Sequence, residues 1–135
     1  MMVDSGASET VASPDKFEAY ELIMTNAVGT KYSSASEAGT AIVNKGEKVI
    51  EVTDEKGVGS QVRIQICDGL SPNKILASVS RLVQAGHSVV FQDPQWGSYV
   101  QNNKNKYRTY LRQENGAYYL DLWVKKVPVF TRQGM

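Results

Sequence analysis

Apolar and polar residues alternate along two neighbouring segments in the first half of the chain. The segments are residues 48–53 (KVIEVT) and residues 61–67 (QVRIQIC). In the second segment Val62, Ile64 and Ile66 fall on one side of the chain, and the polar residues between them fall on the other. A repeat of two residues is typical of a β-strand with one buried face. Glycines between the segments favour a turn, so we predict two strands joined by a short connection.

One segment has the residue spacing of a helix. Its apolar residues recur at intervals of three and four positions, at Ile75, Leu76, Val79, Leu82 and Val83. The pair Ser71-Pro72 is a common helix start, and Gly86 stands where a helix typically ends. These signals predict one short helix over residues 73–85, followed by a strand over residues 88–92.

The C-terminal third has the pattern of a β-hairpin. Residues 107–113 alternate in polarity, and Asn115-Gly116 after them is a strong signal for a two-residue turn. Residues 117–124 (AYYLDLWV) are expected to return as an aromatic-rich strand, and Tyr99 and Val100 to lie on another short strand. The whole pattern predicts an all-β fold class, mostly β with one short helix.

Basic and acidic residues nearly cancel along the chain. There are 15 Lys and Arg against 14 Asp and Glu, which gives a net charge of +1 at pH 7. This balance argues against nucleic acid or an anionic membrane surface as a partner. The most basic stretch, residues 104–108, is expected to be a solvated loop. No stretch reaches the ~20 apolar residues of a membrane span, and the first residues lack a signal-peptide pattern, so we predict no membrane partner.

The single cysteine, Cys67, and the single histidine, His87, limit the available chemistry. One cysteine leaves no disulfide within the chain and suits a reducing compartment, so a cytoplasmic location is expected. One Cys and one His do not supply the usual ligands of a zinc site. We expect Cys67 to pack as a small residue of its strand, and His87 to be a surface or capping residue after the helix.

The segment with candidate chemistry is residues 1–10 (MMVDSGASET), in which an apolar run leads into Asp4. A carboxylate at the end of a strand is held on a rigid element. Gly6 lets the backbone turn and approach another chain closely, and the Ser5 hydroxyl can bond across an interface. One carboxylate cleaves peptides poorly, but two side by side share a proton and act as base and acid. A plain surface turn is the alternative, because Asp, Ser and Gly are common turn residues.

Asp4-Ser5-Gly6-Ala7 resembles the Asp-Ser/Thr-Gly-Ala motif of retropepsins, the aspartic proteases of retroviruses and retrotransposons. The later segments follow a similar order, with a flap region at about residues 31–47 and then the alternating strands. The stretch ILASVSRLVQAG looks like that of copia-type proteases. The resemblance implies a retropepsin-like acid protease barrel with one lobe per chain. Residues 1–94 would be the protease domain, and residues 95–135 a C-terminal β-hairpin extension of the same domain.

The resemblance also implies roles for single residues. Asp4 would be the catalytic residue of each subunit in a homodimer, activating water to hydrolyse an extended polypeptide, with a retroelement polyprotein as the substrate. No metal or organic cofactor is implied. The other implied site residues are the loop supports Ser5, Gly6 and Ala7, the substrate-binding flap residues Ser36, Glu37, Ala38 and Gly39, and the cleft-packing residues Leu76 and Ala77.

Three features depart from the family pattern. Ser78 stands where retropepsins usually have glycine before the helix, and only three residues precede Asp4, as expected for a piece cut from a polyprotein. Residues after about 95 exceed the retropepsin pattern and would either replace missing interface strands or extend the sheet. Two alternatives stay open. One is a catalytically inactive retropepsin-like dimerisation or peptide-binding domain, and the other is a monomeric β-barrel interaction module.

Overall fold

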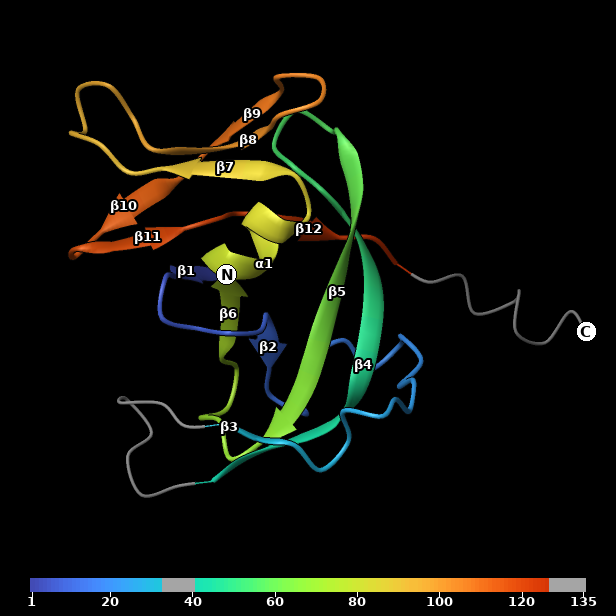
Figure 1. Cartoon of the computed structure of the whole chain (residues 1–135). Helices are drawn as coiled ribbons and strands as arrows, with labels where there is room; N and C mark the ends of the chain where they lie inside the picture. Colours follow the sequence, from blue (N-terminus) through green and yellow to red (C-terminus); the bar gives the residue numbers. More distant parts are fainter. Residues whose placement is uncertain (33–40, 127–135) are drawn as a thin grey trace, which may run out of the picture.

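The computed structural model describes residues 1–32 and 41–126. This part of the chain is mostly β with one short helix, as the sequence pattern predicts (Figure 1). In chain order the elements are β1 Met2–Asp4, β2 Val11–Ala12, β3 Lys31–Tyr32, β4 Ile42–Thr53, β5 Gly59–Asp68, β6 Ile75–Ser78, α1 Val79–Gln84, β7 His87–Val90, β8 Tyr99–Asn102, β9 Arg108–Tyr110, β10 Arg112–Glu114, β11 Ala117–Tyr119 and β12 Trp123–Val124.

Two sheets make up the described structure. The larger has nine strands in the order β10-β11-β1-β6-β2-β5-β4-β12, with β3 also paired to β4, and the smaller is β7-β8-β9. Most pairs are antiparallel, but β1 pairs with β6 and β2 with β5 in parallel. The described residues do not form a closed barrel. The outermost strands β10 and β12 do not bond to each other. The chain passes from the smaller sheet to the larger one at Leu111, between β9 and β10, and the Leu111 N–H donates to the Ser98 carbonyl at 2.8 Å.

The long ribbon of β4 and β5 provides the centre of the core. The two predicted strands are confirmed and are longer than expected, and they pair antiparallel with Ile50 opposite Val62 and Lys48 opposite Ile64. The backbone at Asp54 and Val58 closes the turn, with an N–H to O distance of 3.0 Å. The buried apolar cluster consists of Ile50, Val52, Ile64 and Ile66 of this ribbon together with Ala12 of β2. The alternation in the sequence therefore identified the apolar face of β5 that packs in this cluster.

The predicted helix over residues 73–85 is wrong in its first half. Residues 75–78 form β6, which lies between β1 and β2, and the helix begins only after Ser78. The Ser71-Pro72 pair belongs to a turn, in which the Lys74 N–H donates to the Ser71 carbonyl at 3.3 Å. The helix end is confirmed, since Gly86 has a φ of 94° and its N–H donates to the Val83 carbonyl at 3.1 Å.

The C-terminal third extends both sheets. The predicted Asn115-Gly116 turn is confirmed, with φ of 51° and 79°, values that a two-residue hairpin turn requires. The strand predicted over residues 107–113 is divided at Leu111, because β9 joins the small sheet and β10 joins the large one. The return strand is divided as well, since β11 pairs with β1 and β12 pairs with β4. No helix in the described part of the chain is long and apolar enough to cross a membrane.

Candidate functional site

Asp4 is the last residue of β1, where it lies opposite Ser78 of β6 in parallel register. Its side chain is half-buried, and its Oδ1 accepts a hydrogen bond of 2.8 Å from the Gly6 N–H. This bond turns the chain back directly after the strand. Ser5 and Gly6 are exposed at the tip of that turn, and Ala7 is half-buried. The rigid strand thus fixes where the carboxylate lies, while the turn after it stays open to solvent.

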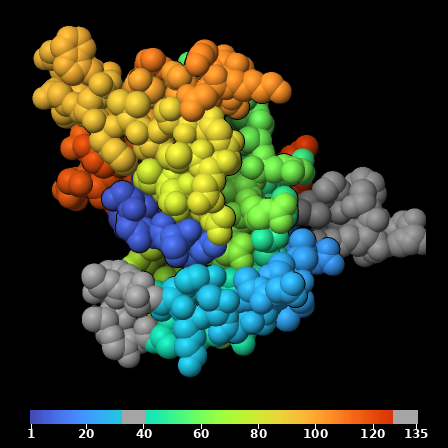
Figure 2. Space-filling view, viewed as in Figure 1, coloured from blue at the N-terminus to red at the C-terminus, as the bar shows by residue number. Residues whose placement is uncertain are grey.

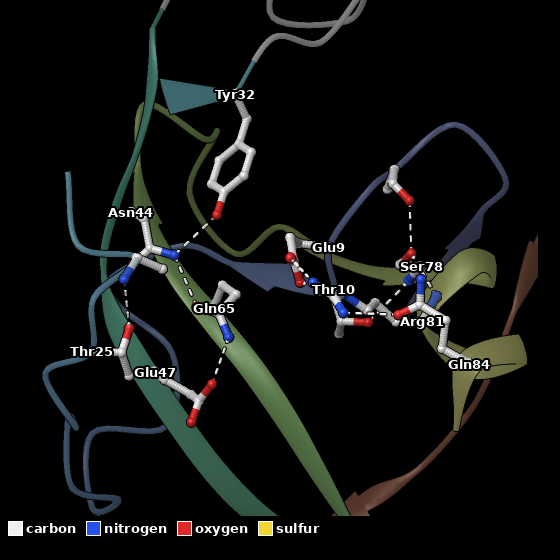
Figure 3. Close-up of polar contacts among 12 residues, drawn as sticks. Glu9, Thr10, Thr25, Tyr32, Asn44, Glu47, Gln65, Ser78, Arg81 and Gln84 are labelled. Carbon is white, nitrogen blue, oxygen red and sulfur yellow. Dashed lines mark hydrogen bonds and ion pairs between the residues drawn. The ribbon is translucent and has the colours of Figure 1, made fainter. Parts of the chain in front are cut away.

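Ser78 holds the loop of residues 4–10 in place (Figure 3). Its side chain is fully buried, and its Oγ donates to the Ala7 carbonyl at 2.7 Å. The same Oγ accepts from the Arg81 N–H at 3.1 Å and so caps the start of α1. The Ser78 N–H donates to Thr10 Oγ1 at 3.0 Å. One hydroxyl therefore joins the Asp4 loop to the helix, a role that glycine at this position would not fill.

Arg81 makes the second connection between the helix and the loop. Its Nε donates to Glu9 Oε2 at 2.8 Å, and its second terminal nitrogen contacts the other carboxylate oxygen of Glu9. Its remaining nitrogen donates to Gln84 Oε1 at 2.8 Å. The bond to Glu9 raises the pKa of the Arg81 guanidinium above its usual value. The Glu9 carboxylate is thus fully engaged by a permanent cation.

A pocket of about 880 Å³ lies over the Asp4 loop. Leu76 lines it, whereas Ala77 is buried behind it, opposite Val3. The predicted flap residues Ser36, Glu37, Ala38 and Gly39 lie outside the described residues, but the strand that leads to them contributes Lys31 and Tyr32 to the wall. The full lining is Met2, Val3, Asp4, Ser5, Gly6, Ala7, Ser8, Glu9, Val11, Lys31, Tyr32, Ile42, Leu70, Leu76, Gly116, Ala117 and Tyr118.

A row of buried polar side chains begins at this wall and follows β4 and β5 (Figure 3). We call Asn44, Gln65 and Glu47 the buried polar chain. Asn44 Nδ2 lies 3.2 Å from the Tyr32 hydroxyl and donates to Gln65 Oε1 at 2.9 Å. Gln65 Nε2 in turn donates to Glu47 Oε1 at 2.8 Å, and Arg63 completes the row at Glu47 Oε2 with 2.6 Å. Each of these buried groups has a hydrogen-bond partner. The buried polar chain therefore holds β4 in place where it leaves the pocket.

Two carboxylates of the described residues, Asp4 and Glu9, line the pocket, but they do not form a pair of the kind that shares a proton. Glu9 is held by Arg81, whereas Asp4 receives a hydrogen bond only from its own loop among the described residues. In residues 1–32 and 41–126 no group of three or more His, Cys, Asp or Glu side chains is placed to hold a metal ion. Among the described residues this arrangement offers one available carboxylate, and a division of acid and base roles would need a second.

Cys67 and His87 lie apart from the Asp4 loop. Cys67 is fully buried in β5 and packs in a second apolar cluster with Val11, Ile42 and Leu76, as predicted for a small core residue. Burial raises the pKa of its thiol to about 11, so it stays protonated at neutral pH. His87 Nδ1 lies 3.2 Å from the Leu82 carbonyl near the end of α1, in agreement with the predicted capping position.

The sequence reasoning did not assign Glu9, Thr10, Ser78 or Arg81 to the site. The pairing of Glu9 with Arg81 joins residues 72 positions apart and leaves no local signal. Ser78 had one, since a serine directly before a helical run is a typical N-cap. Comparisons with models of protein families, with curated proteins and with solved structures found no significant match to this chain.

Proposed function

We propose that the chain is one subunit of a homodimeric aspartic endopeptidase of the retropepsin type, one lobe per chain, that cuts an extended polypeptide such as a retroelement polyprotein. The observation that supports this most is the position of Asp4. It ends a strand, accepts a hydrogen bond from the Gly6 N–H and lies in the wall of the pocket of about 880 Å³. The carboxylate is half-buried and is not engaged by a cation among the described residues.

A second copy of the chain completes the proposed catalytic pair. The only other carboxylate that lines the pocket among the described residues, Glu9, is bound on both oxygens by Arg81 and is not available to share a proton. A two-fold axis next to the exposed Ser5 and Gly6 would bring the Asp4 side chains of two subunits together. Two carboxyl groups in direct contact do not both ionise, because the like charges would repel, so one of them keeps its proton.

The paired carboxyl groups divide the work of hydrolysis. The ionised Asp4 takes a proton from a bound water, and the oxygen of that water attacks the scissile carbonyl carbon. The protonated Asp4 of the other subunit gives its proton to the carbonyl oxygen, which yields a tetrahedral diol. The C–N bond then breaks as the first Asp4 passes the proton it took from water to the leaving amine, and the second Asp4 takes a proton back from a hydroxyl of the diol. Ser5, Gly6 and Ala7 hold the two carboxyl groups in place, and Leu76 and Ala77 pack under the loop. The pocket wall at Lys31 and Tyr32 leads into the proposed flap, which would pair with the backbone of the substrate.

The test is cleavage of an unstructured polypeptide over a range of pH by the wild type and two variants. We expect acid-favoured cleavage that a pepstatin-like inhibitor reduces and that Asp4→Asn abolishes. Asp93→Asn is the matched control, because Asp93 Oδ1 accepts the Gln95 N–H at 2.9 Å in the same local arrangement as Asp4 and Gly6. Asp93→Asn should cleave like the wild type. Cleavage that survives in Asp4→Asn would refute the assignment.

An inactive wild type would favour the alternative function. A chain that dimerises and binds the polypeptide without cutting it is a retropepsin-like dimerisation or peptide-binding domain. Sedimentation of the wild type beside the cleavage assay separates the cases. A dimer without cleavage supports the inactive domain, and a stable monomer at high concentration supports the interaction module.

A further inference from the structure

The strand β5 has a neighbour along only part of one edge. Its other edge pairs with β4 over its whole length, from Gly59 to Asp68. On the side away from β4, β2 pairs with β5 only at Gln65 and Ile66. No described strand continues beside residues 59–63, and Gly59, Ser60, Gln61 and Arg63 are exposed. Half of a central strand thus has a free edge in the described structure (Figure 1).

The register shows which backbone groups face this free edge. The Gln65 N–H points away from β4, because it donates to the Thr10 carbonyl at 2.8 Å. Backbone groups alternate in direction along a strand, so Gly59, Gln61 and Arg63 point the same way as Gln65. An independent contact agrees. The Glu51 carbonyl, opposite Gln61, is directed outward and accepts from the Lys125 N–H at 2.8 Å on the other side of β4. The free edge therefore offers donors and acceptors at 59, 61 and 63.

A groove follows the free edge, between β5 on one side and α1 and β7 on the other. Two hollows of about 480 and 560 Å³ form it, and they share the lining residues Gln61, Val62, Leu82 and His87. Figure 2 views the molecule from the face on which the helix and β7, in yellow, border β5, in green. Five residues of strand span about 16 Å, which is the length of the unpaired stretch. We call the groove formed by these two hollows the β5 groove.

The chemistry of the β5 groove alternates as well. Val62 and Leu82 give it an apolar side, and Leu120 and Leu122 line the hollow nearer Asp54. Arg63 and Arg81 lie in the other hollow, but Glu47 and Glu9 pair with them, so the groove presents little net charge. We propose that the β5 groove binds an extended peptide segment of a partner protein, which adds a strand beside residues 59–63 and places every second, apolar side chain against Val62 and Leu82. The lining of this site has only Glu9 in common with that of the Asp4 pocket, and strand addition at residues 59–63 does not depend on the function proposed there.

The test uses a soluble probe peptide, acetyl-Lys-Thr-Val-Thr-Val-Thr-Lys-amide, and two substitutions at one position. Gln61→Pro removes an N–H that faces the groove and none that pairs with β4, which is the arrangement in which an edge strand tolerates proline. Gln61→Ala removes the same side chain but keeps the N–H. We expect the wild type and Gln61→Ala to bind the peptide alike, and Gln61→Pro to bind it about tenfold more weakly. Equal binding by all three, or no binding at about 1 mM peptide, would overturn the proposal.

Amide hydrogen exchange of the wild type supplies a second measurement that does not need the proline variant to fold. Without peptide, the Gln61 and Arg63 amides should exchange much faster than those of Val62 and Ile64, which pair with β4. The peptide should slow exchange at Gln61 and Arg63. Unchanged exchange would contradict the proposal. Protection without peptide would also contradict it, because another segment of the chain, or a second copy if the protection grows with concentration, would then occupy the edge.

Discussion

The buried polar chain and the Asp4 pocket are neighbouring regions that differ in how their polar side chains are hydrogen-bonded. Asn44 is completely buried, and its amide bonds both Gln65 and the Gly46 N–H, the latter at 2.9 Å. Asp4 is half-buried, and its carboxylate bonds only the Gly6 N–H within the described residues. The first region satisfies every group it removes from water, while the second leaves most of a carboxylate without a protein partner.

This difference separates residues that support the fold from residues that are free to react. Substitution of a buried amide that has two hydrogen-bond partners lowers stability strongly, because both partners are left without a hydrogen bond. A half-exposed carboxylate contributes little to folding and remains available to substrate or to a second carboxylate. Substitutions in the buried polar chain should therefore change stability, and substitutions at Asp4 should change activity.

The largest effect on stability is expected at the centre of the buried polar chain. Asn44→Ala leaves the Gly46 N–H without its acceptor and Gln65 Oε1 without its donor, in a site with no access to water. We expect the free energy of unfolding to fall by about 3 kcal/mol in urea denaturation. Asn103→Ala, at an exposed site, is the control and should change it by less than about 0.5 kcal/mol. If Asn44→Ala lowered the free energy of unfolding by less than about 1 kcal/mol, the buried polar chain would not be a structural element.

A smaller loss of stability is expected at Ser78, a buried polar residue that holds the Asp4 loop. Ser78→Ala removes the cap of α1 and the bond to the Ala7 carbonyl. The free energy of unfolding should fall by about 1–2 kcal/mol, and the Ala7–Thr10 segment should exchange its amides faster. Ser80→Ala on the exposed side of the same helix is the matched control, since helical propensity slightly favours alanine there. Equal stability of the two variants would contradict the role given to Ser78.

The parts of the fold that the sequence predicted depend on local signals. Alternation identified β4 and β5, Asn115-Gly116 identified the hairpin turn, and Gly86 identified the helix end. Residues 75–78 were predicted as helix because their apolar spacing fits one. They are a strand because β1 and β2 lie on either side of Leu76, a contact between distant segments. Tertiary pairing here overrides local periodicity.

The candidate site divides in the same way. That Asp4 ends a strand and is followed by a glycine turn can be read from ten residues of sequence. That Ser78 and Arg81 hold its loop depends on parallel pairing between β1 and β6, which brings residues about 70 positions apart together. No local pattern encodes that pairing. Residues 36–39 of the predicted flap lie outside the described part of the chain, so their role stays a prediction.

Asp54 lies outside both regions, and its carboxylate should make the stability of the fold depend on pH. The Tyr107 hydroxyl donates to Asp54, which is buried at the end of the β4–β5 ribbon, and this bond lowers the pKa of Asp54 despite the opposing effect of burial. A carboxyl group with a lowered pKa in the folded state adds stability above its unfolded pKa of about 3.9 and loses it as the pH falls through the folded value.

Tyr107→Phe should remove part of this acid dependence. Thermal unfolding between pH 7 and pH 2 should show a shallower decline below about pH 4 in Tyr107→Phe than in the wild type. Tyr118→Phe serves as the control, because the Tyr118 ring packs on Phe91 with centroids 4.8 Å apart and is not bonded to Asp54. Identical acid profiles for the wild type and Tyr107→Phe would mean that the Tyr107 bond does not contribute to the lowered pKa.

The smallest effect on stability is expected at Asp4, where the proposed effect on activity is largest. In Asp4→Asn the amide oxygen still accepts the Gly6 N–H, and no ion pair is lost among the described residues. The free energy of unfolding should therefore change by no more than about 0.5 kcal/mol at pH 7, with the same protection of the Gly6 amide. A loss above about 1 kcal/mol would instead make Asp4 a structural turn residue. Loss of cleavage in that variant would then follow from damage to the loop, since the carboxylate would no longer be separable from the fold.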